Sequence, residues 1–176
     1  IVKILLSNFE IDVNMPIQWS SGSVTKRASL IYAIQNQKVD IIKYLVSLEN
    51  TNVNVKYYDF KLGYFSALNC AISTNNIEIV KLLLEREDLD VNIKDRRYEP
   101  VNSGYIGVYY DICPLYNSIL KRNIDILKLL ISHKNIKLDV KISRKMDDYI
   151  KDAFKNYRLY LTTGYEKYDK TKYTDN

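Results

Sequence analysis

Apolar residues recur along the chain in a pattern that repeats four times. Each copy places leucine, isoleucine or valine at helical spacing, has a lysine near its start and ends in a polar stretch. The copies are IVKILLSNFEIDVN from Ile1, IIKYLVSLENTNVN from Ile41, IVKLLLEREDLDVN from Ile79 and ILKLLISHKNIKLD from Ile126. Self-similarity of this kind is typical of a stacked repeat array, in which function lies on surfaces.

A second apolar phrase precedes three of these segments at a fixed distance. Each phrase opens with a leucine, and the lysine of the next segment follows thirteen residues later: Leu30 and Lys43, Leu68 and Lys81, Leu115 and Lys128. Small or apolar residues follow each leucine at the third and fourth positions, as on one face of a helix. Each unit is therefore predicted to be a pair of short helices. Only neighbouring units can bury such helices, because isolated helices below about 12 residues are marginal in water.

The order of these elements resembles the ankyrin repeat, which combines a β-turn and two helices over about 33 residues. The segment SALNCAISTNNIEIVKLLLEREDLDVNIKD, from Ser66 to Asp95, carries the resemblance best. The resemblance implies an all-α repeat solenoid of stacked ankyrin-type helix pairs over residues 1–140. Within this array we expect a partial unit at 1–14 and helix-pair units at 28–54, 66–92 and 113–139.

The chain departs from the family's usual residues at the ends of its helices. Where the family has Thr-Pro-Leu-His, only Ser66 keeps a hydroxyl for capping and only Pro114 keeps the proline. The family's turn glycine is replaced by Gln37, Asn75 and Arg122, of which only asparagine adopts a left-handed conformation readily. We therefore expect modest stability per unit.

The units exceed the family's length in the segments that join them, 15–27, 55–65 and 93–112. Each segment contains β-forming residues around a turn with a glycine: Gly22, Gly63 and Gly104. In an ankyrin array these segments correspond to the finger that links one unit to the next. The sequence therefore predicts helix pairs joined by extended β-hairpin fingers.

The fingers are rich in tyrosine, which is favoured at protein-binding surfaces because it combines a large apolar face with a polar tip. The same aromatic residues can instead stabilise a hairpin by cross-strand pairing. The resemblance implies a binding site on the concave surface, formed by the fingers and the exposed face of the first helices. The candidate partner-binding residues are Trp19, Gln35, Asn36, Tyr57, Tyr58, Tyr64, Ser73, Thr74, Tyr98, Tyr105, Tyr109, Tyr110 and Lys121.

The inventory of reactive residues argues against catalysis. The one histidine, His133, lies at the end of a second helix, and the two cysteines, Cys70 and Cys113, supply neither metal-ligand spacing nor a nucleophile–base arrangement. No phosphate-binding loop occurs among the five glycines. We predict that the protein is not an enzyme and has no metal, cofactor or small-molecule substrate. We expect reduced thiols, an intracellular location (cytoplasmic or nuclear) and no membrane span.

The net charge of +5 is not concentrated in a basic stripe, so nucleic acid is not the expected partner. The favoured function is a protein–protein interaction module, a scaffold or adaptor that binds another protein through the concave face and the fingers. Two alternatives stay open. The array could be a structural spacer without a dedicated ligand, or it could bind nucleic acid or another acidic surface, with a steep dependence on salt.

The last 36 residues, 141–176, stand apart from the repeats. Apolar residues between Met146 and Leu161 recur at helical spacing and predict an amphipathic helix over about 144–161. This helix either caps the end of the stack and precedes a disordered tail, or belongs to a further finger whose unit lies beyond the end of the chain.

Overall fold

The computed structural model of the 176-residue chain describes residues 12–15, 28–59, 63–100 and 107–137. The helices in these residues are α2 (Ser29–Gln35), α3 (Val39–Ser47), α4 (Ala67–Ser73), α5 (Ile77–Leu84), α6 (Pro114–Leu120) and α7 (Ile124–Ile131). The strands are β1 (Lys56–Asp59), β2 (Gly63–Ser66), β3 (Asp95–Pro100) and β4 (Gly107–Ile112). Most of the predicted partial unit and first finger, and the whole of 141–176 with its predicted capping helix, lie outside the described residues.

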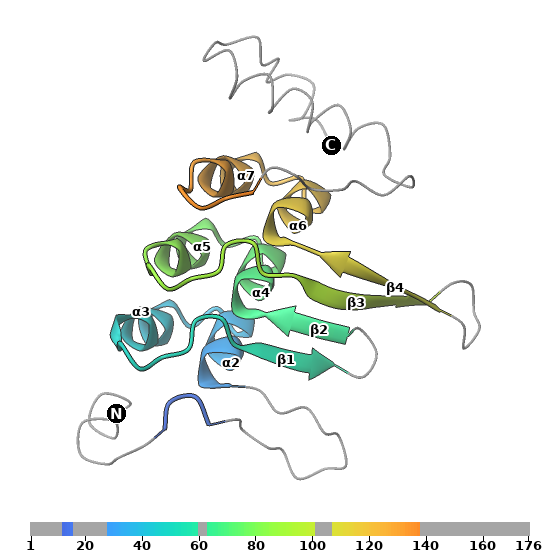
Figure 1. Cartoon of the computed structure of the whole chain (residues 1–176). Helices are drawn as coiled ribbons and strands as arrows, with labels where there is room; N and C mark the ends of the chain where they lie inside the picture. Colours follow the sequence, from blue (N-terminus) through green and yellow to red (C-terminus); the bar gives the residue numbers. More distant parts are fainter. Residues whose placement is uncertain (1–11, 16–27, 60–62, 101–106, 138–176) are drawn as a thin grey trace.

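The helices form three pairs that stack on one another (Figure 1). Helices α2, α4 and α6 make one column, and α3, α5 and α7 make a second column beside it, on the side away from the strands. The predicted solenoid of helix pairs is therefore confirmed. The label all-α is not confirmed, because the fingers of the described part form a four-stranded sheet.

The sheet consists of two antiparallel hairpins, β1–β2 and β3–β4, in the order β1-β2-β3-β4. The hairpins meet where the Cα of Gly63 pairs with that of Arg97. Gly63 has φ +91°, and a Cβ at this position would lie 2.3 Å from the carbonyl oxygen of Arg96. Gly63 was predicted as part of a turn; it is instead the first residue of β2, where a side chain would separate the two fingers.

The apolar core runs through all three helix pairs. Its first-helix residues Leu30, Ile34, Leu68, Ile72, Leu115 and Ile119 and its second-helix residues Ile42, Leu45, Ile79, Leu83, Ile126 and Leu130 are each at most 3% exposed. Burying one such side chain contributes roughly 1.5–3 kcal/mol. The helices are seven to nine residues long, so this burial stabilises them more than their own hydrogen bonds do.

The helix caps agree with the predicted departures from the family pattern. The Ser66 hydroxyl accepts a hydrogen bond from the Asn69 N–H at the start of α4, and Pro114 occupies the first turn of α6. Helix α2 has no side-chain cap, because its N-cap residue is Ala28. The second helices α5 and α7 are capped by Asn76 and Asn123, whose amide oxygens accept from backbone N–H groups.

One asparagine per unit links each loop to the next unit. The Asn54 side chain donates to the Asp88 carbonyl and accepts from the Asp90 N–H, both at 2.7 Å. Asn14 and Asn92 make equivalent bonds to the loops at 50–52 and 135–137. The polar ending of the repeated segment therefore sets the register between units.

Arg86 adds a contact that the other two described helix pairs lack. Its guanidinium donates to the carbonyls of Val46 and Leu48 at 2.8 Å, at the C-terminal end of α3, and binds Asp88 through two nitrogens. The hydrogen bond from Arg86 lowers the pKa of the Asp88 carboxyl group. Arg86 thus covers the exposed carbonyls at the C-terminus of a neighbouring helix.

The turns inside the helix pairs are left-handed without glycine. Gln37, Asn75 and Arg122 have φ of 51°, 57° and 54°. This conformation costs most residues about 1–2 kcal/mol, and asparagine tolerates it best. Two of the three turns therefore carry backbone strain that a glycine would relieve.

Asn54→Ala should destabilise the stack by about 1–2 kcal/mol, because it removes two hydrogen bonds between units. The matched control is Asn52→Ala, which removes only a local hydrogen bond to the N–H of Asn54 and should cost under about 1 kcal/mol. Urea unfolding followed by circular dichroism measures both. Equal losses for the two variants would show that the cross-unit bonds contribute nothing beyond a surface turn.

Arg122→Gly should stabilise the chain by about 0.5–1 kcal/mol, since relief of the left-handed strain outweighs the greater entropy of the unfolded chain. Asn75→Gly should give a smaller gain or a loss, because asparagine tolerates this conformation and its amide oxygen accepts from Asn123 at 2.6 Å. The midpoint of thermal unfolding reports both effects. A lower midpoint for Arg122→Gly would contradict the strain argument.

Candidate partner-binding groove

The last turns of α2 and α4 present equivalent pairs of polar residues beside the β1–β2 hairpin. Gln35 and Asn36 lie at the end of α2. Ser73 and Thr74 lie at the end of α4, 38 residues later in each case. Two of these side chains also bond the last turn of their own helix: Asn36 Nδ2 donates to the Tyr32 carbonyl, and Thr74 Oγ1 donates to the Ala71 carbonyl.

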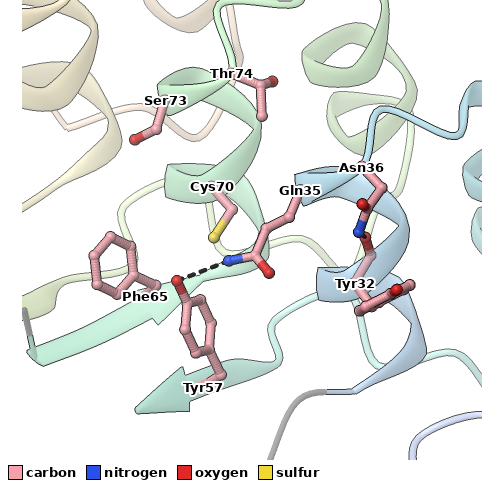
Figure 2. A pocket seen from close by; sticks show the side chains of 8 residues that line it. All are labelled: Tyr32, Gln35, Asn36, Tyr57, Phe65, Cys70, Ser73 and Thr74. Atoms are coloured by element: carbon pink, nitrogen blue, oxygen red, sulfur yellow. Dashed lines mark hydrogen bonds between the residues drawn. The ribbon is translucent and has the colours of Figure 1, made fainter. Parts of the chain in front are cut away.

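These four residues line a hollow of about 460 Å³ between the two helices and the hairpin (Figure 2). We call this hollow the groove. Its lining residues are Tyr32, Gln35, Asn36, Tyr57, Phe65, Cys70, Ser73 and Thr74. None of the eight carries a formal charge, so the groove is a neutral surface of hydroxyl, amide and aromatic groups.

The hairpin supplies an aromatic wall to the groove. The rings of Tyr57 and Phe65 stack across the two strands with centroids 5.1 Å apart, and Tyr57 is only 6% exposed. Gln35 Nε2 donates to the Tyr57 hydroxyl at 2.8 Å, which ties the wall to α2. Arg97 from the next finger lies with its guanidinium carbon 3.3 Å from the centroid of Phe65. Tyr57 is therefore a packed and hydrogen-bonded part of the wall.

Two other predicted tyrosines lie on the opposite face of the same hairpin. Tyr58 and Tyr64 are 42% and 46% exposed, and their ring centroids are 5.0 Å apart. Because successive strand residues point to opposite faces, a strand that directs Tyr57 into the groove directs Tyr58 away from it. The tyrosines of this finger therefore form two separate surfaces.

The remaining predicted site residues are not among the described residues that line the groove. Tyr98 is half-buried on β3, and Lys121 is an exposed residue at the end of α6, one unit beyond Thr74. Tyr109 and Tyr110 lie in β4, but their side chains are outside the described part of the structure. Trp19 and Tyr105 also lie outside the described residues.

Three lining residues were not among the predicted site residues: Tyr32, Phe65 and Cys70. Tyr32 and Cys70 lie three residues before Gln35 and Ser73, so helical spacing places them on the same faces. Phe65 pairs with Tyr57 across the hairpin. Tyr32 and Cys70 could therefore have been predicted from the sequence, whereas predicting Phe65 required the register of the two strands.

A buried carboxylate fixes the fingers to α4. Asp95, at the start of β3, is 0% exposed, and its Oδ2 accepts from the Ser66 N–H at 2.8 Å, the Ser66 hydroxyl at 3.1 Å and Asn69 Nδ2 at 2.9 Å. Lys56 Nζ lies 4.0 Å from its other oxygen. Residues of both hairpins thus converge on the N-terminus of α4, where a negative charge is favourable.

The same network reaches the groove through the third helix pair. Asn117 on α6 is buried, and its Nδ2 lies 3.1 Å from both the carbonyl and the side-chain oxygen of Asn69. It also donates to Ser73 Oγ at 3.4 Å. The Ser73 hydroxyl therefore has one of its acceptor positions occupied from the adjacent unit.

The other reactive residues have structural contacts. Neither Cys70 nor Cys113 is in a disulfide; Cys113 Sγ accepts from the Tyr116 N–H, and burial raises the pKa of its thiol. His133 Nδ1 accepts from the Asn135 N–H in the turn after α7. In the part of the chain that the structure describes, no group of three histidine, cysteine or carboxylate residues is placed to hold a metal ion.

A comparison with protein-family models identifies the class of this fold. The model for ankyrin repeats, three copies, matches residues 1–95, which is more than half of the chain. The chain belongs to the ankyrin-repeat family, as its repeated segments predicted. Helices α6 and α7 lie beyond the matched residues and continue the stack by a further pair.

Ankyrin repeats are in general protein–protein interaction modules and are typically not catalytic. The comparison with curated proteins gave no match. Among the helices that the structure describes, none is long and apolar enough to cross a membrane.

The Asp95 network predicts an unusual pH dependence. Burial raises the pKa of the Asp95 carboxyl group, and the hydrogen bonds from Ser66 and Asn69 oppose this only in part. The folded chain therefore holds the proton more tightly than the unfolded chain, and this group lowers the free energy of unfolding as pH rises from about 4 through the raised pKa. Asp95→Asn removes this loss, so its stability relative to wild type should increase over that range.

Asp88→Asn is the matched control of opposite sign. Because the pKa of Asp88 is lowered in the folded chain, its carboxylate stabilises the protein above about pH 4, and this stabilisation is lost as pH falls through the lowered value. Relative to wild type, the variant should therefore lose stability as pH rises towards 4. Urea unfolding from about pH 3 to pH 8 measures both differences. The same trend in both variants would contradict the assignment.

Proposed function

We propose that the protein is an adaptor that binds a protein partner in the groove between α2, α4 and the β1–β2 hairpin. The observation that carries this proposal is convergence: Gln35, Asn36, Tyr57, Ser73 and Thr74 were selected from the sequence as partner-binding residues, and all five line one hollow. They come from two helices and one strand of two successive units.

The chemistry of the groove supports a protein ligand. A concave site with aromatic walls and a few hydrogen-bonding groups is typical of ligand pockets, and tyrosine is enriched among residues that dominate binding energy. A nucleic acid would need lysine or arginine for its phosphates, and no lining residue is charged. A structural spacer would have no use for hydroxyl and amide groups at a hollow between units.

Tyr58 and Tyr64, which point away from the groove, are assigned no contact with the partner; their role in this proposal is to stabilise the hairpin. Their ring contact is a cross-strand pair of the kind that stabilises two-stranded ribbons. The two cysteines, neither of which is in a disulfide, support the further expectation of an intracellular location, because reduced cysteines persist in reducing compartments.

A photo-crosslinking amino acid at Thr74 should form covalent adducts with the partner in extracts of the cells that produce this protein. The matched control carries the same amino acid at Ser47, which is exposed at the end of α3 in the other helix column. Mass spectrometry identifies the adducts, and circular dichroism verifies that both variants fold.

A protein adduct at Thr74 that is absent at Ser47, and that disappears when Asn36 is changed to arginine, is the expected result. Asn36 is exposed at the edge of the groove, so an arginine there should block it without disturbing the core. Equal adducts at both positions, or none at either, would refute the groove as the binding site.

A further inference from the structure

The ends of the three first helices are aligned in a row, because side-chain hydrogen bonds join the turns that follow them. Asn76 Nδ2 donates to Gln37 Oε1 at 3.3 Å. Asn123 Nδ2 donates to Asn75 Oδ1 at 2.6 Å. The residues that begin these turns are the C-caps of α2, α4 and α6, which are Asn36, Thr74 and Lys121. Lys121 therefore lies in line with two residues of the groove, one unit further along the stack.

The third unit continues the lining positions of the groove with different side chains. Leu120 and Lys121 lie at the end of α6 as Gln35 and Asn36 lie at the end of α2. Leu120 is 39% exposed, and Lys121 is also exposed. Among the described residues, Lys121 forms no ion pair. The inner face thus extends beyond the groove to an exposed leucine and an exposed positive charge.

Every formal charge in this row of helices and turns is positive. Helices α2, α4 and α6 contain no charged residue, and the turns that follow them contain only Lys38, Lys121 and Arg122, all exposed. On the described fingers, strand alternation places two half-buried charges on the groove side, Asp59 and Arg97, which are of opposite sign. The inner face therefore combines a neutral groove with an excess of positive charge, which is largest at the third unit.

The spacing of the units determines where a bound segment meets this charge. Packed helices lie about 8–10 Å apart, so Lys121 is about one such step beyond Thr74. An extended peptide advances about 3.3–3.6 Å per residue and covers that step in about three residues. At that point an aspartate or glutamate would be attracted, whereas a lysine or arginine would be repelled.

We propose that the protein segment bound in the groove continues over the end of α6 and places an aspartate or glutamate side chain against Lys121. The charge of Arg122 adds to the attraction, and the segment covers Leu120. An exposed ion pair changes binding only a few-fold, so this contact selects among partners more than it supplies affinity. The inference rests on the proposed function, because it extends the segment that the groove binds.

The test is a selection of random peptides on the immobilised full chain, followed by affinity measurements on every peptide whose binding Asn36→Arg blocks. These peptides should share an acidic residue at one position. Lys121→Glu should weaken their binding roughly three- to tenfold, because attraction becomes repulsion. Raising the salt concentration from about 0.1 M to about 1 M should remove most of this difference, since the Debye length falls from about 10 Å to about 3 Å.

Lys81→Glu is the matched control. Lys81 is exposed on α5, in the other helix column, and its substitution changes the net charge by the same amount. It should alter binding less than about twofold. Circular dichroism verifies that both variants fold.

A charge exchange completes the test. A peptide in which lysine replaces the shared acidic residue should bind wild type more weakly than the original peptide does, and should bind Lys121→Glu more tightly than the original does. A folding defect in the variant would not produce this reversal. Groove-dependent peptides without a shared acidic residue, or without the reversal, would overturn this inference and leave the proposed function intact. A selection that yields no peptide blocked by Asn36→Arg would overturn both.

Discussion

Helices of seven to nine residues cannot persist alone in water, and this constraint governs the whole molecule. Each helix is stable only because its apolar face is buried against the units on either side. The repeated leucines and isoleucines therefore have to lie at equivalent positions in every unit. Polar residues between them acquire equally regular positions, which is why Gln35 and Ser73 lie at equivalent positions of neighbouring helices and line the same hollow.

Hydrogen bonds between units refine this stacking. The asparagines at the end of each repeated segment bond the next loop with nearly identical distances. Other contacts occur in a single described unit, and these affect the groove. Asp95 holds both hairpins at α4, and Asn117 links that network to Ser73, so the shape of the groove depends on three successive units.

The sequence was sufficient for the features that repeat. Periodicity predicted the helix pairs, and the equivalent positions 35, 36, 73 and 74 were selected because the resemblance to ankyrin repeats implies a binding site on the exposed face of the first helices. Strand alternation implies that Tyr57 and Tyr58 face opposite sides, but which side meets the helices depends on how the hairpin packs. Asp95 and Gly63 owe their roles to contacts with distant segments, and no local pattern marks such contacts.

The inner face varies from unit to unit while the core stays constant. Tyr32, Cys70 and Asn117 occupy equivalent positions, as do Asn36, Thr74 and Lys121. The first two members of each set give a neutral groove between α2 and α4. In the third unit, the amide of Asn117 is buried and donates to Ser73 Oγ, and Lys121 is exposed at the end of α6. Because the scaffold accommodates these differences without altering the stack, the charge and the hydrogen-bonding groups that this face presents change from one unit to the next.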